Sequence, residues 1–289
     1  MRRSMIAGAP VVALFLAACA SSSSPSSALS SSGASFTPSA TCSPASLKTT
    51  VTGKFTAATG SPAFLPWVAD DKPENGKGYE SAVTYAVAKK LGYTEADVVW
   101  IRTTFDSAIA PGPKKFDVNI QQFSITEDRK KAVDFSSGYY VLTQAVVTYA
   151  GSPIAKATTV AGLKGAKLGA AVATTSLDAI NSVIAPNVPA KIYNSNADAV
   201  AALKAKQIDG LVVDLPTAFY IAGAELDHGI IVGQLPHTAD SKEQLGFLLA
   251  KGSPLTACVT KAVDSLRADG TLAKLQDQWL AQAGAPVLS

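Results

Sequence analysis

The residues best suited to chemistry lie in the segment 117–135, DVNIQQFSITEDRKKAVDF. Apolar and polar residues alternate in its first part, which predicts a buried strand. Thr126 is typical of an N-cap, and the two acids after it suit the first turn of a helix. Ser124 and Arg129 would then converge at a strand end, where a hydroxyl and a planar guanidinium fork can bind one carboxylate. The alternative is that Arg129 is a solvated charge in a basic run.

Two later strand ends carry polar groups that could complete such a site. The run Ala173-Thr174-Thr175-Ser176 precedes a helix expected at 177–184, whose first N–H groups can bind an anion. Asp214 follows a buried strand expected at 210–213, and open α/β sheets bind ligands at the carboxyl ends of their strands. Ordinary helix capping by these residues is the alternative in both cases.

The elements that must position these groups alternate between strand and helix. This pattern indicates an α/β fold with mainly parallel sheets. About 240 residues follow the N-terminal region, enough for one large or two medium domains. Strands are expected at 54–58, 98–102, 145–149, 163–171, 210–213 and 246–250, and helices at 80–91, 177–184, 196–206, 217–222, 255–268 and 271–280.

The N-terminus has the pattern of an export signal. Arg2 and Arg3 precede an apolar stretch at 5–18 that is short for a membrane span. We therefore expect residues 1–18 to be a signal peptide that is removed from the mature protein. An ordinary secretory signal, with an incidental cysteine after it, is the alternative to the lipoprotein signal described next.

The end of this stretch, Leu16-Ala17-Ala18-Cys19, resembles the lipobox of bacterial lipoproteins. The resemblance implies that Cys19 is lipidated and becomes the mature N-terminus. Several acyl chains would give a stable anchor, whereas a single chain is marginal. Residues 19–53, serine-rich at 20–41, have too few large apolar side chains to order themselves and are expected to form a tether.

The charge balance argues against nucleic acid as a partner. The chain has a formal net charge of +3, which falls to about +1 when Arg2 and Arg3 leave with the signal peptide. A nearly neutral mature protein has no electrostatic basis for binding a polyanion.

Two cysteines remain once Cys19 is assigned to the lipid. An exported chain meets an oxidising compartment, where two remaining cysteines favour one disulfide. We predict the pair Cys42–Cys258. Two unpaired buried thiols are the alternative.

With these residues placed, the chain resembles the bacterial solute-binding proteins of family 3, the polar amino-acid receptors of ABC importers. The resemblance covers roughly residues 54–282, and its strength lies in the order of many short motifs. These are Gly78-Tyr79-Glu80, Phe105-Asp106, Phe116-Asp117-Val118, Ser124-Ile125-Thr126-Glu127-Asp128-Arg129-Lys130, Val133-Asp134-Phe135-Ser136, Tyr139-Tyr140, Leu163-Lys164-Gly165, Ala173-Thr174-Thr175, Asp209-Gly210-Leu211-Val212-Val213-Asp214 and Leu266-Arg267-Ala268-Asp269-Gly270-Thr271.

The resemblance implies a two-lobed α/β fold of the type II periplasmic-binding-protein kind. Two hinge strands would join the lobes, and a ligand between them would favour closure by contacting both. The expected limits are 54–146 plus 251–285 for lobe 1, 152–245 for lobe 2, and 147–151 and 246–250 for the hinges.

The resemblance also assigns roles to individual residues. Arg129 matches the arginine that binds the ligand's α-carboxylate, and Asp214 matches the acid that binds its α-ammonium. The remaining implied contacts are Ser124, Thr174 and Thr175 beside Arg129, and an aromatic wall of Phe64, Trp67 and Phe105.

Some positions depart from the family pattern. Ser61 stands where relatives that bind cationic side chains often have an acid, which favours a ligand with a neutral side chain. Gln122 stands where many members have a small residue, usually glycine, so we expect it to shrink the pocket or to donate to a polar side chain. Ala173 replaces the usual glycine before the two threonines, and the stretch 110–113 is shorter and richer in proline.

The expected function is that of an extracytoplasmic substrate-binding protein of an ABC importer. It would be a monomer, anchored to the cell membrane by lipid, that delivers an amino acid or related zwitterion to a membrane permease. A receptor domain that presents its ligand to a membrane kinase is an alternative with the same site. A dehydratase of cyclohexadienyl acids on the same fold is another, but it would need a general acid near a leaving hydroxyl.

The sequence lacks the motifs of the other common functions. It contains no G-x-S-x-G, no phosphate-binding loop and no paired-cysteine metal motif, so we expect no cofactor, no metal and no enzyme activity. His228 and His237 fall in the polar stretch 227–242, which we expect to be a surface loop.

Overall fold

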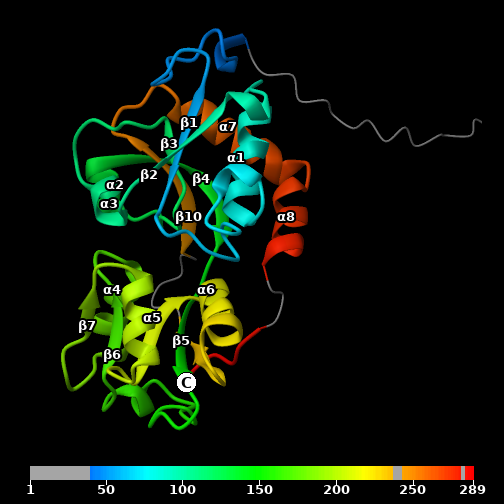
Figure 1. Ribbon diagram of the computed structural model, residues 1–289. Coiled ribbons are helices and arrows are strands. Elements are labelled where there is room, and N and C mark those ends of the chain that lie inside the picture. Colours follow the sequence, from blue (N-terminus) through cyan, green and yellow to red (C-terminus); the bar gives the residue numbers. More distant parts are fainter. Residues whose placement is uncertain (1–39, 237–242, 281–283) are drawn as a thin grey trace, which may run out of the picture. The chain divides into compact units, whose positions relative to one another are not determined.

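The computed structural model describes residues 40–236, 243–280 and 284–289. Within these ranges, ten strands form two five-stranded sheets with helices on both faces of each (Figure 1). The expected signal peptide, the lipidation site Cys19, most of the expected tether and His237 lie outside the described residues.

The first sheet has the strand order β2-β1-β3-β10-β4. The central strand β1 runs parallel to β2 and β3, whereas β10 runs antiparallel to β3 and β4. The strands are β1 (Phe55–Thr59), β2 (Val98–Arg102), β3 (Val118–Asn119), β4 (Val133–Val141) and β10 (Gln244–Ala250).

The second sheet has the order β7-β6-β8-β5-β9. Strand β6 is parallel to β7 and β8, and β5 is antiparallel to β8 and β9. Both sheets are therefore mixed, and the expectation of mainly parallel sheets is wrong. The strands are β5 (Gln144–Tyr149), β6 (Leu168–Ala171), β7 (Lys191–Tyr193), β8 (Gly210–Asp214) and β9 (Gly229–Gln234).

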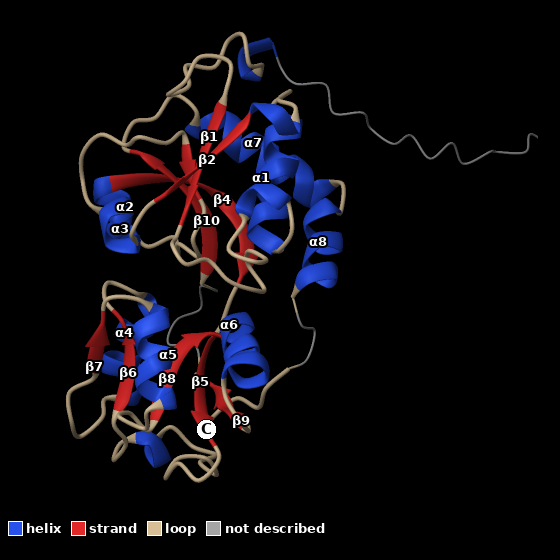
Figure 2. Cartoon of the chain, in the orientation of Figure 1, coloured by secondary structure: helices blue, strands red, loops and turns tan. Residues whose placement is uncertain are grey.

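Helices cover both faces of the first sheet (Figure 2). On one face, α1 (Tyr79–Lys90), α7 (Thr256–Ala268) and α8 (Thr271–Trp279) enclose the larger core, which includes Phe55, Val118 and Phe247. On the other face, the short helices α2 (Phe105–Ile109) and α3 (Glu127–Ala132) pack over a smaller cluster around Phe123 and Leu248. Burial on both faces agrees with the fully buried strand β1 and with the apolar run at residues 245–250 of β10.

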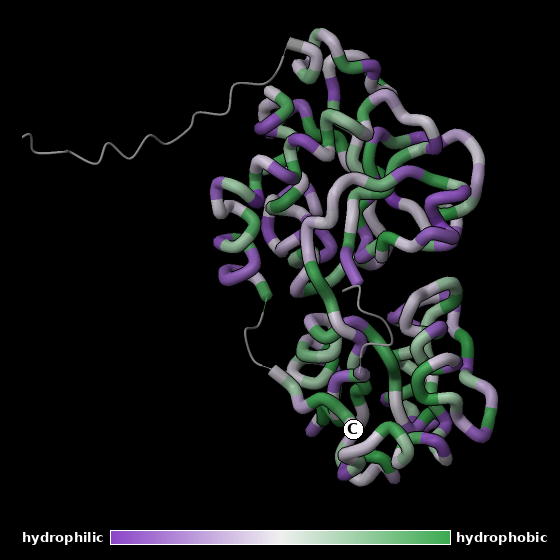
Figure 3. The backbone as a smooth tube through the Cα atoms, turned by 180° about the vertical axis from the view of Figure 1, so that it is seen from behind, coloured by the Kyte–Doolittle hydropathy of each residue, from purple (hydrophilic) through white to green (hydrophobic). Residues whose placement is uncertain are grey.

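The second sheet is covered in the same way. Helix α4 (Thr175–Ala179), continued by a π-helical turn at Ile180–Ile184, packs on one face. Helices α5 (Asn196–Lys204) and α6 (Leu215–Tyr220), the latter continued by a π-helical turn at Ile221–Glu225, pack on the other. Figure 3, which colours the backbone by hydropathy, shows hydrophobic (green) stretches alternating with hydrophilic (purple) ones along the chain. Short 3-10 turns occupy Ala40–Cys42, Pro73–Asn75, Glu95–Asp97 and Ala161–Leu163.

The chain passes between the sheets at places other than those expected. It leaves the first sheet after Val141 and enters the second at Gln144, so the change falls at Leu142 and Thr143 rather than at 147–151. It leaves the second sheet after Gln234 and enters the first again at Gln244, before the expected 246–250. The reason is that β5 and β10 are paired within a single sheet over their whole length. The two connections meet through a hydrogen bond from Leu142 N to Glu243 O of 3.0 Å.

Most of the expected elements occur, with small shifts at their ends. Within the expected strand 163–171, only Leu168–Ala171 is extended, and the expected helix at 177–184 begins earlier, at Thr175. The sequence did not predict β4, β7 or β9. Strand β9 lies inside the stretch 227–242 that was expected to be a loop, because its short run GIIVGQ has no alternating pattern.

Two links hold the ends of the described chain. The disulfide Cys42–Cys258 is present, as predicted, and ties the N-terminal 3-10 turn to α7. At the other end, Val287 forms a parallel bridge with Gln234 of β9, and Leu288, 2% exposed, packs in the core of the second sheet. In the described ranges no helix has both the length and the apolar character that membrane crossing requires.

The disulfide closes a loop between residues 216 positions apart, so its loss should release much chain entropy in the unfolded state. We expect the double variant Cys42→Ser/Cys258→Ser to lose about 2–5 kcal/mol of unfolding free energy, measured by denaturant titration. Reductant should destabilise the native protein by a similar amount and leave the double variant unchanged. Two free thiols in the non-reduced native protein would contradict this prediction.

Candidate ligand-binding site

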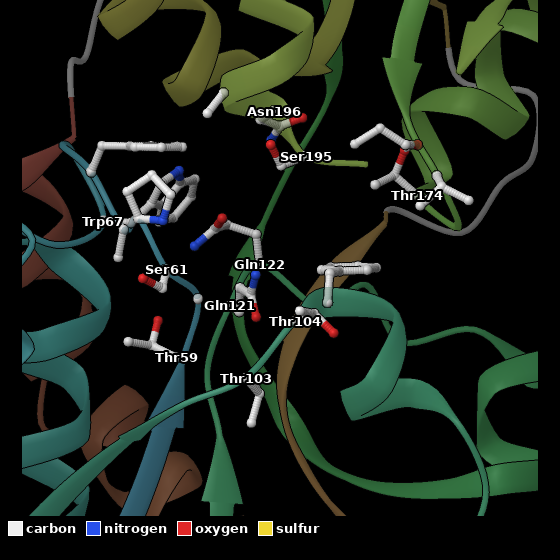
Figure 4. Close-up of a pocket in the computed structure, with 18 of the residues that line it drawn as sticks. Thr59, Ser61, Trp67, Thr103, Thr104, Gln121, Gln122, Thr174, Ser195 and Asn196 are labelled. Carbon is white, nitrogen blue, oxygen red and sulfur yellow. The ribbon is translucent and has the colours of Figure 1, made fainter. Parts of the chain in front are cut away.

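A cavity of about 130 Å³ is lined by loops that follow strands of both sheets (Figure 4). Every predicted ligand residue except Ser124 contributes to its wall. The lining residues are Thr59, Gly60, Ser61, Pro62, Ala63, Phe64, Trp67, Thr103, Thr104, Phe105, Gln121, Gln122, Arg129, Ala171, Val172, Thr174, Thr175, Ser176, Asn194, Ser195, Asn196, Ala197 and Asp214.

Arg129 is held in the cavity wall by main-chain oxygens. Thr126 caps α3 as expected, because its hydroxyl accepts from Arg129 N at 3.2 Å. The guanidinium donates through Nη1 to Ser124 O at 2.8 Å and through Nη2 to Ala173 O at 2.9 Å. Its Cζ lies 5.3 Å from the ring centroid of Phe105. No carboxylate of the described residues lies within ion-pair distance of this cation. It is therefore equipped to bind a carboxylate from outside the chain.

Ser124 supports the site from behind rather than lining it. Its side chain is 2% exposed, and its hydroxyl lies 3.2 Å from the hydroxyl of Thr175. Its carbonyl accepts from Arg129, so its main chain, more than its side chain, serves the guanidinium. This contact between the two hydroxyl groups links the first sheet to the start of α4.

The loop before α4 places the two threonines differently. The Thr174 hydroxyl accepts from Leu177 N at 3.3 Å and donates to Ala171 O at 2.7 Å, so it caps the helix. The Thr175 hydroxyl is near Ser124 and lies at the cavity. Ala173 has a φ of 61°, a left-handed conformation that glycine adopts more easily, in agreement with the glycine that the family resemblance implies at this position.

Asp214 faces the cavity although it occupies the N-cap position of α6. Its side chain makes no capping hydrogen bond, so the alternative of a simple cap does not hold. Its Oδ1 accepts from Gln144 Nε2 at 3.0 Å. Burial, and then the negative charge of Glu243, raise the pKa of Asp214 from 3.8 to about 7. A nearby ammonium group would favour the ionised carboxylate.

Gln144 and Glu243 extend this acidic region to the connections between the sheets. Gln144 Nε2 lies 3.3 Å from Glu243 Oε2 and 3.3 Å from Thr175 Oγ1, and Gln144 Oε1 accepts from Ser176 at 2.7 Å. One amide, at the start of β5, thus contacts two carboxylates, Asp214 at the end of β8 and Glu243 directly before β10. Sequence patterns did not predict this group, because its members come from separate segments that only the crossings bring together.

Two aromatic residues of the loop before α1 contact α6 of the second sheet. Trp67 is 1% exposed, and its Nε1 donates to Thr217 Oγ1 at 2.8 Å. Phe64 stacks on Tyr220, with ring centroids 6.3 Å apart and an interplanar angle of 7°. The predicted aromatic wall therefore also joins the elements of the two sheets.

Gly78 makes the approach of this loop to α1 possible. A Cβ on Gly78, whose φ is 96°, would lie 2.5 Å from Trp67 O. Because Gly78 has no Cβ, the two carbonyls can approach the helix. Trp67 O accepts from Glu80 N at 3.0 Å, and Pro66 O accepts from Tyr79 N at 2.8 Å. These carbonyls satisfy the first N–H groups of the helix, in place of a side-chain cap.

Gln122 is bound to a buried acid. Gln122 has a φ of 49°, a left-handed conformation that agrees with the glycine that the family resemblance implies at this position. Its N donates to Glu80 Oε1 at 2.8 Å, and its Nε2 donates to Glu80 Oε2. Tyr139 OH also donates to Glu80 Oε1. Burial raises the pKa of Glu80 from 4.5 to about 7, although these hydrogen bonds act to lower it.

Several lining residues were not predicted from the sequence. Among them, Asn194, Ser195 and Asn196 form a polar run after β7, and their position at a strand end could have drawn attention to them. His228 is exposed in the turn before β9 and is not near the cavity lining. Among the described residues, no group of three or more His, Cys, Asp or Glu side chains could hold a metal ion.

Comparisons with known proteins agree with this architecture. Residues 58–282 match the model of the bacterial extracellular solute-binding proteins, family 3. The chain is 29% identical to the L-cystine-binding protein TcyJ of Escherichia coli (strain K12) over 211 residues, which cover 71% of this chain and 76% of that protein. It is 30% identical to the L-arginine-binding protein of Pseudomonas aeruginosa over 186 residues, 62% of this chain and 71% of the other.

A solved structure shows the same fold. An ancestral arginine-binding protein bound to glutamine superposes with a TM-score of 0.65 and 32% identity, covering 79% of this chain and 98% of the other. The fold is that of the type II periplasmic binding proteins, and the relatives named here are binding proteins rather than enzymes. The family match spans most of the chain, and this chain belongs to the bacterial extracellular solute-binding proteins of family 3.

Proposed function

We propose that this chain is the extracytoplasmic substrate-binding protein of an ABC importer and that it binds an amino acid or a related zwitterion. The observation that carries the proposal is the pair Arg129 and Asp214, a cation without a carboxylate partner among the described residues and a buried acid, in the wall of one cavity. Relatives named for binding cystine and arginine support the ligand class.

In the proposed complex, the ligand's α-carboxylate binds the free donors of Arg129 and the hydroxyl of Thr175. Its α-ammonium binds Asp214. A ligand with only one of these charges would leave the other buried group without a partner, which is costly in a low-dielectric site. The remaining wall, with Ser61 and Phe64, receives the side chain, for which we propose a neutral class.

We further propose that ligand binding draws together two lobes, built on the first and second sheets, about the connection at Leu142 and Thr143. Arg129 follows a strand of the first sheet and Asp214 ends a strand of the second, so one ligand would contact both. Differential contact of this kind is what a ligand needs in order to shift a conformational equilibrium.

The lipid anchor at Cys19, the tether at 19–53 and a monomeric state complete the proposal. The family's extracellular character agrees with an export signal at 1–18. A tethered monomer could reach a permease in the same membrane while its ligand site stays in solvent.

A thermal-shift screen of residues 42–289 against the proteinogenic amino acids tests the ligand class. A ligand at about 100 times its dissociation constant should stabilise the protein by roughly 2.7 kcal/mol.

Arg129→Ala should weaken the binding of whichever amino acid is found by roughly 2–5 kcal/mol, because the carboxylate would be buried without its partner. Lys130→Ala, which removes the adjacent exposed cation, is the matched control and should bind normally. Absence of any shift in the native protein would refute amino-acid binding.

Ligand affinity should rise with pH between about 5 and 8. The pKa of Asp214 is about 7 without ligand, so below this pH a proton must leave before the carboxylate can pair with an ammonium. Isothermal titration at several pH values measures the effect, and Asp214→Asn should bind weakly with a much flatter profile. Affinity that increases as the pH falls would contradict the role of Asp214.

The raised pKa values of Glu80 and Asp214 also affect the stability of the unliganded protein. Ligand affinity should rise with pH, whereas the contribution of these two groups to the unfolding free energy should fall. Between the ordinary values of 4.5 and 3.8 and the folded values of about 7, the folded state binds more protons than the unfolded state. These two groups should therefore lower the unfolding free energy as pH rises through this range, and thermal melts without ligand measure that trend. Glu80→Gln and Asp214→Asn should each make the trend shallower.

If ligand binding closes the two lobes, the protein should become more compact. Small-angle scattering should give a smaller radius of gyration when saturating ligand is added to the native protein, because the ligand's two charges bind to different lobes. Arg129→Ala at the same ligand concentration should show a smaller change. Identical scattering curves with and without bound ligand would rule out hinge closure.

A further inference from the structure

Glu80 is a fully buried acid that lies next to the cavity without lining it. It stands in the first turn of α1 and is 0% exposed. Its two oxygens accept three hydrogen bonds, from Gln122 N, from Gln122 Nε2 and from Tyr139 OH. No basic side chain of the described residues forms an ion pair with it.

Gln122 separates this carboxylate from the cavity. It lines the cavity, whereas Glu80 does not. Figure 4 shows Gln122 among the lining residues, between those that follow the first sheet, such as Thr59 and Ser61, and those at the start of α5. The left-handed backbone lets the main-chain and side-chain N–H groups of one residue reach the same carboxylate.

The side chain of Gln122 is not needed to hold this turn. A glycine would supply the same main-chain N–H to Glu80 and would adopt the φ of 49° without strain. The amide instead takes up cavity space and uses one of its two N–H donors on the acid. Its effect on the cavity is to place a neutral group where a carboxylate would otherwise be exposed.

The other acids near the cavity are also engaged. Asp71 forms an ion pair with Arg102 at 2.7 Å and accepts from Ala63 N at 2.9 Å. Asp214 faces the ammonium position of the proposed ligand. Glu243 lies outside this lining, with its Oε2 3.3 Å from Gln144 Nε2. Asp214 is the one acid among the lining residues described above, so a cationic side chain beside Gln122 would have no second lining carboxylate to pair with, and burial of an unpaired charge is strongly unfavourable.

We propose that Gln122 determines ligand specificity by covering Glu80, so that the cavity accepts an amino acid with an uncharged side chain and rejects one with a cationic side chain. This inference rests on the proposed amino-acid binding and adds the class of side chain and the residue that sets it. Glu80 acts as a positioning residue, since it orients the Gln122 amide and would become a ligand contact only when that amide is removed.

The test is the variant Gln122→Gly, which keeps the main-chain donor and suits the left-handed backbone. Isothermal titration with L-arginine, L-lysine and the uncharged amino acids gives the ratio of the best cationic affinity to the best neutral affinity. We expect this ratio to be low in the native protein and to rise at least about tenfold in the variant, because a cation can then pair with Glu80. Thermal melts of each variant establish that it is folded.

Two controls separate uncovering of the acid from simple enlargement of the cavity. Gln121→Ala removes an adjacent lining amide that does not contact Glu80, and it should leave the ratio unchanged. The double variant Glu80→Gln/Gln122→Gly has the enlarged cavity but lacks the Glu80 carboxylate. The increase in the ratio of cationic to neutral affinity should therefore disappear. A gain that persists in the double variant would overturn the role of Glu80.

The outcomes distinguish this inference from the function on which it rests. If the native protein binds arginine or lysine as tightly as any neutral amino acid, the inference is wrong and amino-acid binding stands. The same holds if Gln122→Gly binds neutral amino acids with an unchanged ratio. If neither the native protein nor the variant binds any amino acid, the proposed function fails and the inference fails with it.

Discussion

The site depends on one guanidinium that is held by main-chain carbonyls and has no carboxylate partner among the described residues. Arg129 donates to Ser124 O, next to the first sheet, and to Ala173 O, next to the second. Carbonyl dipoles fix its position but do not cancel its charge. A partly buried cation of this kind gains most from an anion that binds its remaining N–H donors, and Arg129 lines the cavity in which such an anion could bind.

The cavity wall also contains an acid, Asp214, that has no cation paired with it among the described residues. Asp214 shares the Gln144 amide with Glu243. Burial first, and then the negative charge of Glu243, raise the pKa of Asp214 to about 7, although the hydrogen bond from Gln144 acts to lower it. An ammonium group would relieve that repulsion, so the cation and the acid of the cavity each lack what a zwitterion carries.

These charges lie where the chain passes from one sheet to the other. Gln144 is the first residue of β5, directly after the crossing at Leu142 and Thr143, and Glu243 directly precedes β10. The two connections are hydrogen bonded to each other through Leu142 N and Glu243 O. The groups beside the proposed ammonium position are therefore the groups at the crossings, and they would link ligand charge to the hinge proposed at Leu142 and Thr143.

The sequence by itself determined most of the local elements, though not β4, β7 or β9, and the types of residue at the centre of the site. Thr126 caps α3 because a hydroxyl before two acids favours a helix start, and Pro216 in the first turn of α6 leaves Asp214 at the strand end. Tertiary structure decided the rest. Only the strand crossings bring Gln144, Glu243 and Asp214 together, and only the left-handed turn at Gln122 joins its amide to Glu80. Such contacts depend on distances between segments far apart in the chain, and residue type and periodicity carry no information about those distances.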